Sequence, residues 1–80
     1  MDRPIEVIAY AGARGEERPR AIRLTGTTVA VSAVLEAWVE TAPEPGTGIR
    51  RWFRVRLEDG RTLALYHDEA LDGWFWREPV

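Results

Sequence analysis

The chain has 80 residues, of which 45% are hydrophobic and 30% are charged, and its net charge at pH 7 is −2. This composition predicts one small globular domain of ordinary make-up, and the charge argues against a protein that binds polyanions over its whole surface. The absence of cysteine excludes a disulfide framework and a thiolate metal site. No apolar run reaches the length of a membrane span, and the first residues do not have the pattern of a signal peptide. We therefore expect a cytoplasmic protein.

The first quarter of the chain predicts two strands. Residues 4–12 alternate apolar and polar side chains with a period of two, which is typical of a half-buried strand. Residues 11–19 contain two glycines and a proline and predict a loop. Residues 20–26 predict a second strand that ends in a tight turn at Gly26.

The segment over residues 27–40 fits two structures. Its apolar residues alternate strictly, as in a strand, but they also fall on one face of a helix. The threonines and valines at its start favour a strand, and the alanine, leucine and glutamate that follow favour a helix near residues 31–40. We expect a long bent strand, followed by a loop over residues 41–48.

Residues 49–57 and 61–67 predict a β-hairpin around the sequence Glu58-Asp59-Gly60. A two-residue turn would mix arginines and core side chains on one face. A three-residue loop instead places Phe53 opposite Leu65 and puts the charged residues on the other face, and the buried face decides the register. This register also requires a left-handed backbone at Gly60.

The end of the chain predicts a polar connection over residues 67–73 and a last strand from Trp74, with Trp76 on the same face and Phe75 on the opposite face. The predicted fold is all-β: a small antiparallel meander, an SH3-like barrel or half-barrel of five to six strands. A helix near residues 31–40 would make it α+β.

The strip of arginines and aromatics in the predicted hairpin is the first candidate site. Its members share the outward face and surround one exposed tryptophan: Arg50, Trp52, Arg54, Arg56 and Tyr66. Such a face can stack the bases of a single strand while guanidinium groups hold phosphates. It is equally typical of a solvated strand on which arginines cover aromatics. Four acidic residues could pair with these arginines and cancel their charge: Glu58, Asp59, Glu69 and Asp72.

The tryptophans are the second candidate site, because a core this small does not need four of them. Trp38, Trp74 and Trp76 either fill the core or form an exposed patch that binds a protein or a second copy of the chain.

His67 lies beside Asp68, Glu69 and Asp72, a pattern that fits a metal or acid–base site but also a solvated loop. The chain has one histidine and no second group of ligands, and it shows no nucleophile with a base and an orienting group. We therefore expect no catalysis, no metal site and no cofactor.

The chain resembles an uncharacterised bacterial family of short Trp-containing domains, which occur alone or near the C-terminus of Y-family DNA-polymerase-like proteins. The resemblance covers about residues 17–78. It is carried by the hairpin sequence FRVRLEDG, the terminal GWFW and a set of turn and apolar positions: Pro19, Gly26, Val31, Leu35 and Trp38. It implies a β-rich auxiliary domain in a DNA-repair context and brings no catalytic residues.

The sequence predicts a non-catalytic module that binds a protein partner or itself, as a homodimer, through a Trp-rich surface. The alternative is a module that binds single-stranded nucleic acid on the arginine and aromatic face. An enzyme or metalloprotein centred on His67 is the third hypothesis.

Overall fold

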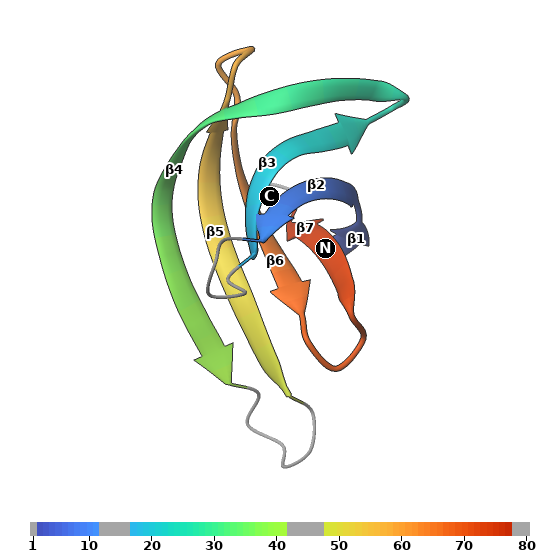
Figure 1. Cartoon of the computed structure of the whole chain (residues 1–80), viewed down its shortest axis with the longest axis vertical. Coiled ribbons are helices and arrows are strands. Elements are labelled where there is room, and N and C mark those ends of the chain that lie inside the picture. The colour runs from blue at the N-terminus through green and yellow to red at the C-terminus, as the bar shows by residue number, and fades with distance from the viewer. Residues whose placement is uncertain (1, 12–16, 42–47, 78–80) are drawn as a thin grey trace.

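The computed structural model describes residues 2–11, 17–41 and 48–77 of the chain. The regular structure in these residues consists of seven strands, which form one curled antiparallel sheet, a half-barrel (Figure 1). The strands are β1 (Asp2–Pro4), β2 (Glu6–Ala11), β3 (Glu17–Leu24), β4 (Thr27–Thr41), β5 (Ile49–Leu57), β6 (Thr62–Asp68) and β7 (Gly73–Arg77). The predicted all-β meander is confirmed, because β2 to β7 follow one another across the sheet in chain order.

The N-terminal segment supplies two of the seven strands where the sequence predicted one. β1 pairs with β7 and β2 pairs with β3, and Ile5 lies between them. The Ile5 N–H donates to the Trp74 carbonyl at 3.0 Å, which keeps this junction bonded to β7. One short stretch of chain therefore connects the first and last strands of the meander.

β4 is a single strand of 15 residues, so the alternative of a helix near residues 31–40 is wrong. Its pairing with β5 shifts register twice, and each shift marks an extra residue in β4. The residues that oppose or pack with the core are therefore Val31, Val34 and Ala37, three apart instead of two. This spacing is close to the period of a helix, which explains why the sequence of this strand also fitted a helix.

The two predicted loops lie mostly at residues 12–16 and 42–47, which are outside the described residues. The first loop was predicted too long, because β3 already begins at Glu17. Pro19 is buried within β3 opposite Ala9, where the β2–β3 register shifts. A bulge is one of the few places in a sheet that accept a proline, because proline has no N–H to donate.

The predicted register of the β5–β6 hairpin is confirmed. Phe53 lies opposite Leu65, and the Leu57 N–H donates to the Arg61 carbonyl at 2.8 Å. Gly60 has a φ of 93°, the left-handed conformation that the three-residue loop requires and that glycine adopts without strain.

The β3–β4 hairpin turns at Thr25 and Gly26, as predicted. Their φ angles are 47° and 80°, and two successive positive φ angles are typical of a type I′ turn. Threonine is a poor residue for this conformation, because its branched side chain crowds the left-handed backbone.

The core lies on one face of the curled sheet, which we call the inner face. Its centre is Ile22 of β3 against Val55, Leu57 and Leu65 of the β5–β6 hairpin, all of them fully or almost fully buried. The partly buried side chains that pack around this centre are Ile5, Val7, Leu24, Val29, Val31, Val34, Trp74 and Trp76. The opposite face, which we call the outer face, carries the arginines and aromatics of the predicted strip.

Candidate protein-interaction surface

The outer face of β5 carries Arg50, Trp52, Arg54 and Arg56, as predicted, because Phe53 and Val55 between them face the core. The strand register adds aromatic side chains from the neighbouring strands. Together with Trp52, three of them form a line across four strands, which we call the aromatic row: Trp38 of β4, Trp52 of β5, Tyr66 of β6 and Phe75 of β7.

The rings of the aromatic row contact one another along its whole length. The Trp38 and Trp52 rings are stacked at an angle of 4° with centroids 5.6 Å apart. The Trp52–Tyr66 and Tyr66–Phe75 centroids are 4.5 Å and 5.4 Å apart. Each such pair contributes about 0.5–1.5 kcal/mol beyond the area that it buries. The row is therefore a second apolar layer, on the face that the sequence assigned to solvent.

The expectation that Trp52 is an exposed tryptophan is wrong, because only 3% of its surface is exposed. Tyr66 beside it is 4% exposed. Trp38, at the β4 end of the row, is 41% exposed. The accessible aromatic surface of the row is therefore at β4 and not on the β5–β6 hairpin.

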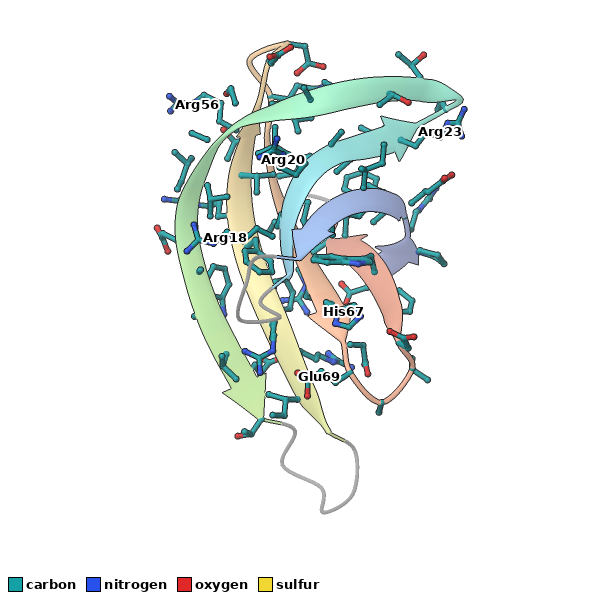
Figure 2. All side chains as sticks on the ribbon, viewed as in Figure 1. Arg18, Arg20, Arg23, Arg56, His67 and Glu69 are labelled. Carbon is teal, nitrogen blue, oxygen red and sulfur yellow. The ribbon has the colours of Figure 1, made fainter. Side chains whose placement is uncertain are left out.

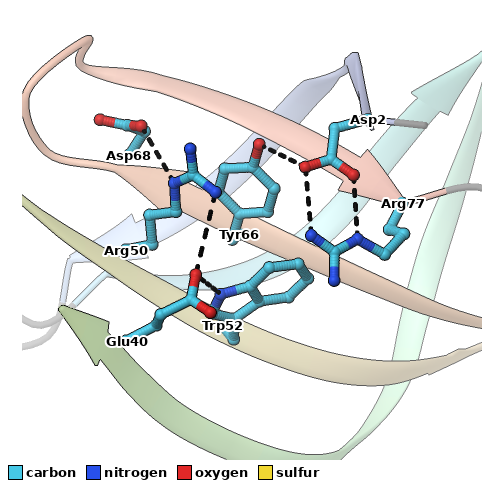
Figure 3. Close-up of polar contacts among 7 residues, drawn as sticks. All are labelled: Asp2, Glu40, Arg50, Trp52, Tyr66, Asp68 and Arg77. Atoms are coloured by element: carbon cyan, nitrogen blue, oxygen red, sulfur yellow. Dashed lines mark hydrogen bonds and ion pairs between the residues drawn. The ribbon is translucent and has the colours of Figure 1, made fainter. Parts of the chain in front are cut away.

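Arg77 covers Trp52 (Figure 3). Its Cζ lies 4.6 Å from the centroid of the Trp52 ring, and its Nε donates to Asp2 Oδ1 at 3.0 Å. The Tyr66 hydroxyl donates to Asp2 Oδ2 at 2.9 Å. The first and last described strands thus meet over the centre of the aromatic row, with the Asp2 carboxylate between a guanidinium and a phenol.

Arg50 covers Tyr66 in the same way, with its Cζ 5.0 Å from the ring centroid. Its Nε lies 3.5 Å from Oδ2 of the buried Asp68. Glu40 lies 3.8 Å from Arg50 and accepts a hydrogen bond from Trp52 Nε1 at 3.1 Å. Both buried rings of the row are therefore covered by arginines that carboxylates hold in place.

These contacts shift two pKa values in opposite directions. The hydrogen bond from Arg77 lowers the pKa of Asp2 below its ordinary value of 3.8. Burial, and then the hydrogen bond to Asp2, raise the pKa of Tyr66 to about 12. At neutral pH Asp2 is ionised and accepts, and Tyr66 is protonated and donates.

The acids that pair with the outer arginines are not the four that the sequence suggested; they are Asp2, Glu36, Glu40 and Asp68. Arg54 pairs with Glu36 of β4, whereas Asp59 pairs with Arg61 and Glu69 with Arg51. Arg56 forms no ion pair with a described side chain and extends outward beside β4 and β5 (Figure 2).

The predicted patch of Trp38, Trp74 and Trp76 does not exist as one surface. Trp76 lies opposite Leu65 and Trp74 lies opposite His67, so both tryptophans of β7 are on the inner face, partly buried against the core. Trp38 is on the outer face of β4. Trp74 and Trp76 therefore follow the core alternative, whereas Trp38 is exposed, and only the register between distant strands decides these faces.

His67 packs against Trp74, with ring centroids 5.0 Å apart, and its Nε2 lies 3.2 Å from Asp72 Oδ1. Glu69, which lies near it in Figure 2, is bonded to Arg51 at 2.7 Å. Among the described residues, no group of three or more histidines and acids is placed to hold a metal ion. These contacts give His67 a packing role on the inner face.

The second half of β4 forms an open edge of the sheet. β3 pairs with β4 only as far as Ala30, and over residues 31–41 β5 is the only described strand that pairs with β4. Figure 1 shows this half of β4 as the outermost strand, beside β5. It carries three exposed large hydrophobic residues, which are Leu35 at 36%, Trp38 at 41% and Val39 at 55%. We call residues 31–41 the β4 edge.

The sequence pointed to Trp38 but not to Leu35, Val39, Asp2 or Arg77. The sequence did contain a signal for Leu35 and Val39, because apolar residues continue along β4 beyond the part of the strand that packs against the core. No local signal joins Asp2 to Arg77, which are 75 residues apart.

The chain matches none of the family models, curated proteins or solved structures with which it was compared. The resemblance to a family of Trp-containing domains therefore stays a prediction. No helix within residues 2–11, 17–41 and 48–77 has the length and apolarity of a membrane span.

Proposed function

We propose that this chain is a non-catalytic module that binds an extended segment of a protein along the β4 edge. The observation that carries this proposal is the combination of an open strand edge with exposed Leu35, Trp38 and Val39. Unpaired backbone groups along a strand bind another strand, and exposed apolar side chains beside them add buried area and specificity. Soluble proteins usually protect such an edge with charge, proline or a covering segment.

The direction of the backbone groups supports the same conclusion. Leu57 N–H donates to Arg61, and Glu69 N–H donates to the Ile49 carbonyl, so the odd-numbered residues of β5 direct their backbone groups to β6. The even-numbered residues then bond to β4, where their partners include Glu36, Trp38 and Glu40.

It follows that the N–H and C=O groups of Ala37, Val39 and Thr41 point away from β5, toward the open edge. They are the groups that a bound strand would use.

The outer face is a poorer candidate for nucleic acid than for protein. Arg50, Arg54 and Arg77 are each paired with a carboxylate, and Trp52 is buried under one of them. A base could stack on Trp52 only after these contacts had opened.

The test is a selection of displayed peptides of random sequence against the immobilised protein, followed by measurement of their affinity for three proteins. We expect the selected peptides to bind the wild type, to lose at least about tenfold in affinity for Ala37→Pro, and to bind Leu71→Arg like the wild type. Proline at position 37 removes an outward N–H and no bond to β5. Leu71 is exposed and distant from β4 in sequence, so its substitution is the control.

Peptides that bind Ala37→Pro as tightly as the wild type would refute a site on the β4 edge. The melting temperature of each variant shows whether it has folded.

A further inference from the structure

The side chains along the β4 edge would fit against the β4 edge of a second copy of the chain. In an antiparallel pair about a two-fold axis, residues at equal distances from the central residue face each other. If Ala37 is central, Leu35 lies opposite the partner's Val39, and Glu36 lies opposite the partner's Trp38. Leu35 and Val39 then contact each other across the two copies, and no like charges are directly opposite.

Three other registers, centred on Trp38, Glu36 and Val39, are poorer. A pair centred on Trp38 would place Glu36 opposite the partner's Glu40 twice, and like charges in this position are destabilising. A pair centred on Glu36 would place this carboxylate opposite itself. A pair centred on Val39 would leave Leu35 beyond the reach of the described part of the partner's strand.

The register centred on Ala37 also satisfies the backbone. The N–H and C=O of Ala37 point to the open edge, so Ala37 and its copy exchange two hydrogen bonds. On the outer face, Trp38 and the partner's Trp38 become diagonal neighbours, within reach of large aromatic side chains. The aromatic rows of the two copies would then meet at the axis.

We propose that the occupant of the β4 edge is a second copy of this chain, in an antiparallel β4–β4 pair with Ala37 on the two-fold axis. This inference rests on the proposed function, because it names the partner at the same edge. The net charge of −2 per chain opposes association only weakly.

Sedimentation of the wild-type chain from about 1 µM to about 500 µM tests the association. We expect a reversible monomer–dimer equilibrium. Val39→Arg should weaken the dimer by about 30-fold or more, because the two-fold axis places two unpaired guanidiniums in the interface. Leu71→Arg is the control, because it introduces an arginine at an exposed leucine outside the β4 edge. This variant should dimerise with the affinity of the wild type.

Cysteine cross-linking tests the register, since the wild type has no cysteine. The Cα atoms of Ala37 and its copy would be about 5.5 Å apart, within the range of a disulfide, so Ala37→Cys should form a cross-linked dimer on mild oxidation. Thr41 would be eight residues from its copy along the paired strands, about 27 Å, so Thr41→Cys should remain uncross-linked.

The two proposals fail in different ways. A wild type that stays monomeric to the highest concentration, while selected peptides still bind at the β4 edge, would overturn the second copy and leave the proposed function standing. A chain that neither dimerises nor binds peptides at this edge would overturn both. A dimer that Val39→Arg and Leu71→Arg weaken equally, or that Thr41→Cys cross-links as readily as Ala37→Cys, would overturn the β4–β4 pair.

Discussion

Replacement of Trp52 tests whether the outer face is a second apolar layer. The ring is 3% exposed, in contact with Trp38 and Tyr66 and covered by Arg77, so its removal should be as costly as the loss of a core residue. If the outer face were solvated, as the sequence suggested, the same change would have little effect on stability.

The magnitude follows from the buried area. A buried aromatic removes about 150–250 Å² from water, which at ~25 cal/mol per Å² gives an upper bound of about 4–6 kcal/mol. Large-to-small replacements of buried aromatics cost about 3–5 kcal/mol. A domain of 80 residues has a total stability of about 4–12 kcal/mol, so Trp52→Ala would remove about a quarter or more of it.

Trp52→Phe is the milder variant. It keeps a ring in the row but loses the hydrogen bond to Glu40 and part of the contact area, so we expect a loss of about 1–2 kcal/mol. Trp38→Phe is the matched control at the exposed end of the row and should cost less.

Urea unfolding followed by far-ultraviolet circular dichroism measures these differences in the free energy of unfolding. In thermal unfolding, a loss of 1 kcal/mol should lower the Tm by about 4–8 °C. A Trp52→Phe variant as stable as the wild type, or one that is more stable than Trp38→Phe, would refute the second layer.

Four further predictions concern the outer face and the β3–β4 turn. In a Tyr10→Phe background the phenol absorbance of Tyr66 should titrate near pH 12; titration near 10 would contradict its burial. Because the folded pKa of Asp2 lies below 3.8, its stabilisation should be complete above pH ~5 and lost as the pH falls through the folded value. The stability gap between wild type and Asp2→Asn should therefore shrink in acid, and a constant gap would show that the ion pair is absent. Thr25→Asn should raise the free energy of unfolding by about 1 kcal/mol, since asparagine accepts the positive φ that threonine resists, and a loss would argue against the type I′ turn. Single-stranded oligonucleotides should leave tryptophan fluorescence unchanged at low salt; quenching that salt reverses and Arg54→Gln weakens would restore the nucleic-acid interpretation.

Local patterns in the sequence predicted the hairpins of this fold well. The β5–β6 register followed from keeping arginines and leucines on separate faces, and Gly60 followed from the loop length. The turn at Gly26 and the opposite facing of Phe75 and Trp76 followed in the same way. Each of these inferences needed only residues that are near one another in the chain.

Predictions that depended on distant strands failed. The burial of Trp52 needs Trp38 and Arg77 beside it, and the bulges in β4 hide the register that brings Trp38 there. The same bulges made β4 resemble a helix. The exposed tryptophan patch was also not found. Whether a residue of β4 lies on the same face as a residue of β7 depends on the register of every strand between them.

The N-terminal segment, which joins β3 on one side and β7 on the other, has a consequence for how the chain folds during synthesis. The hairpins from β2 to β6 involve neighbours in sequence and can form as the chain emerges, but β1 has no partner until β7 has been made. Contacts over such a separation are slow to form, because the closure of a long loop precedes any gain from pairing. The ion pair between Asp2 and Arg77 therefore cannot form until Arg77 has been synthesised, and Trp52 lacks its cover until then.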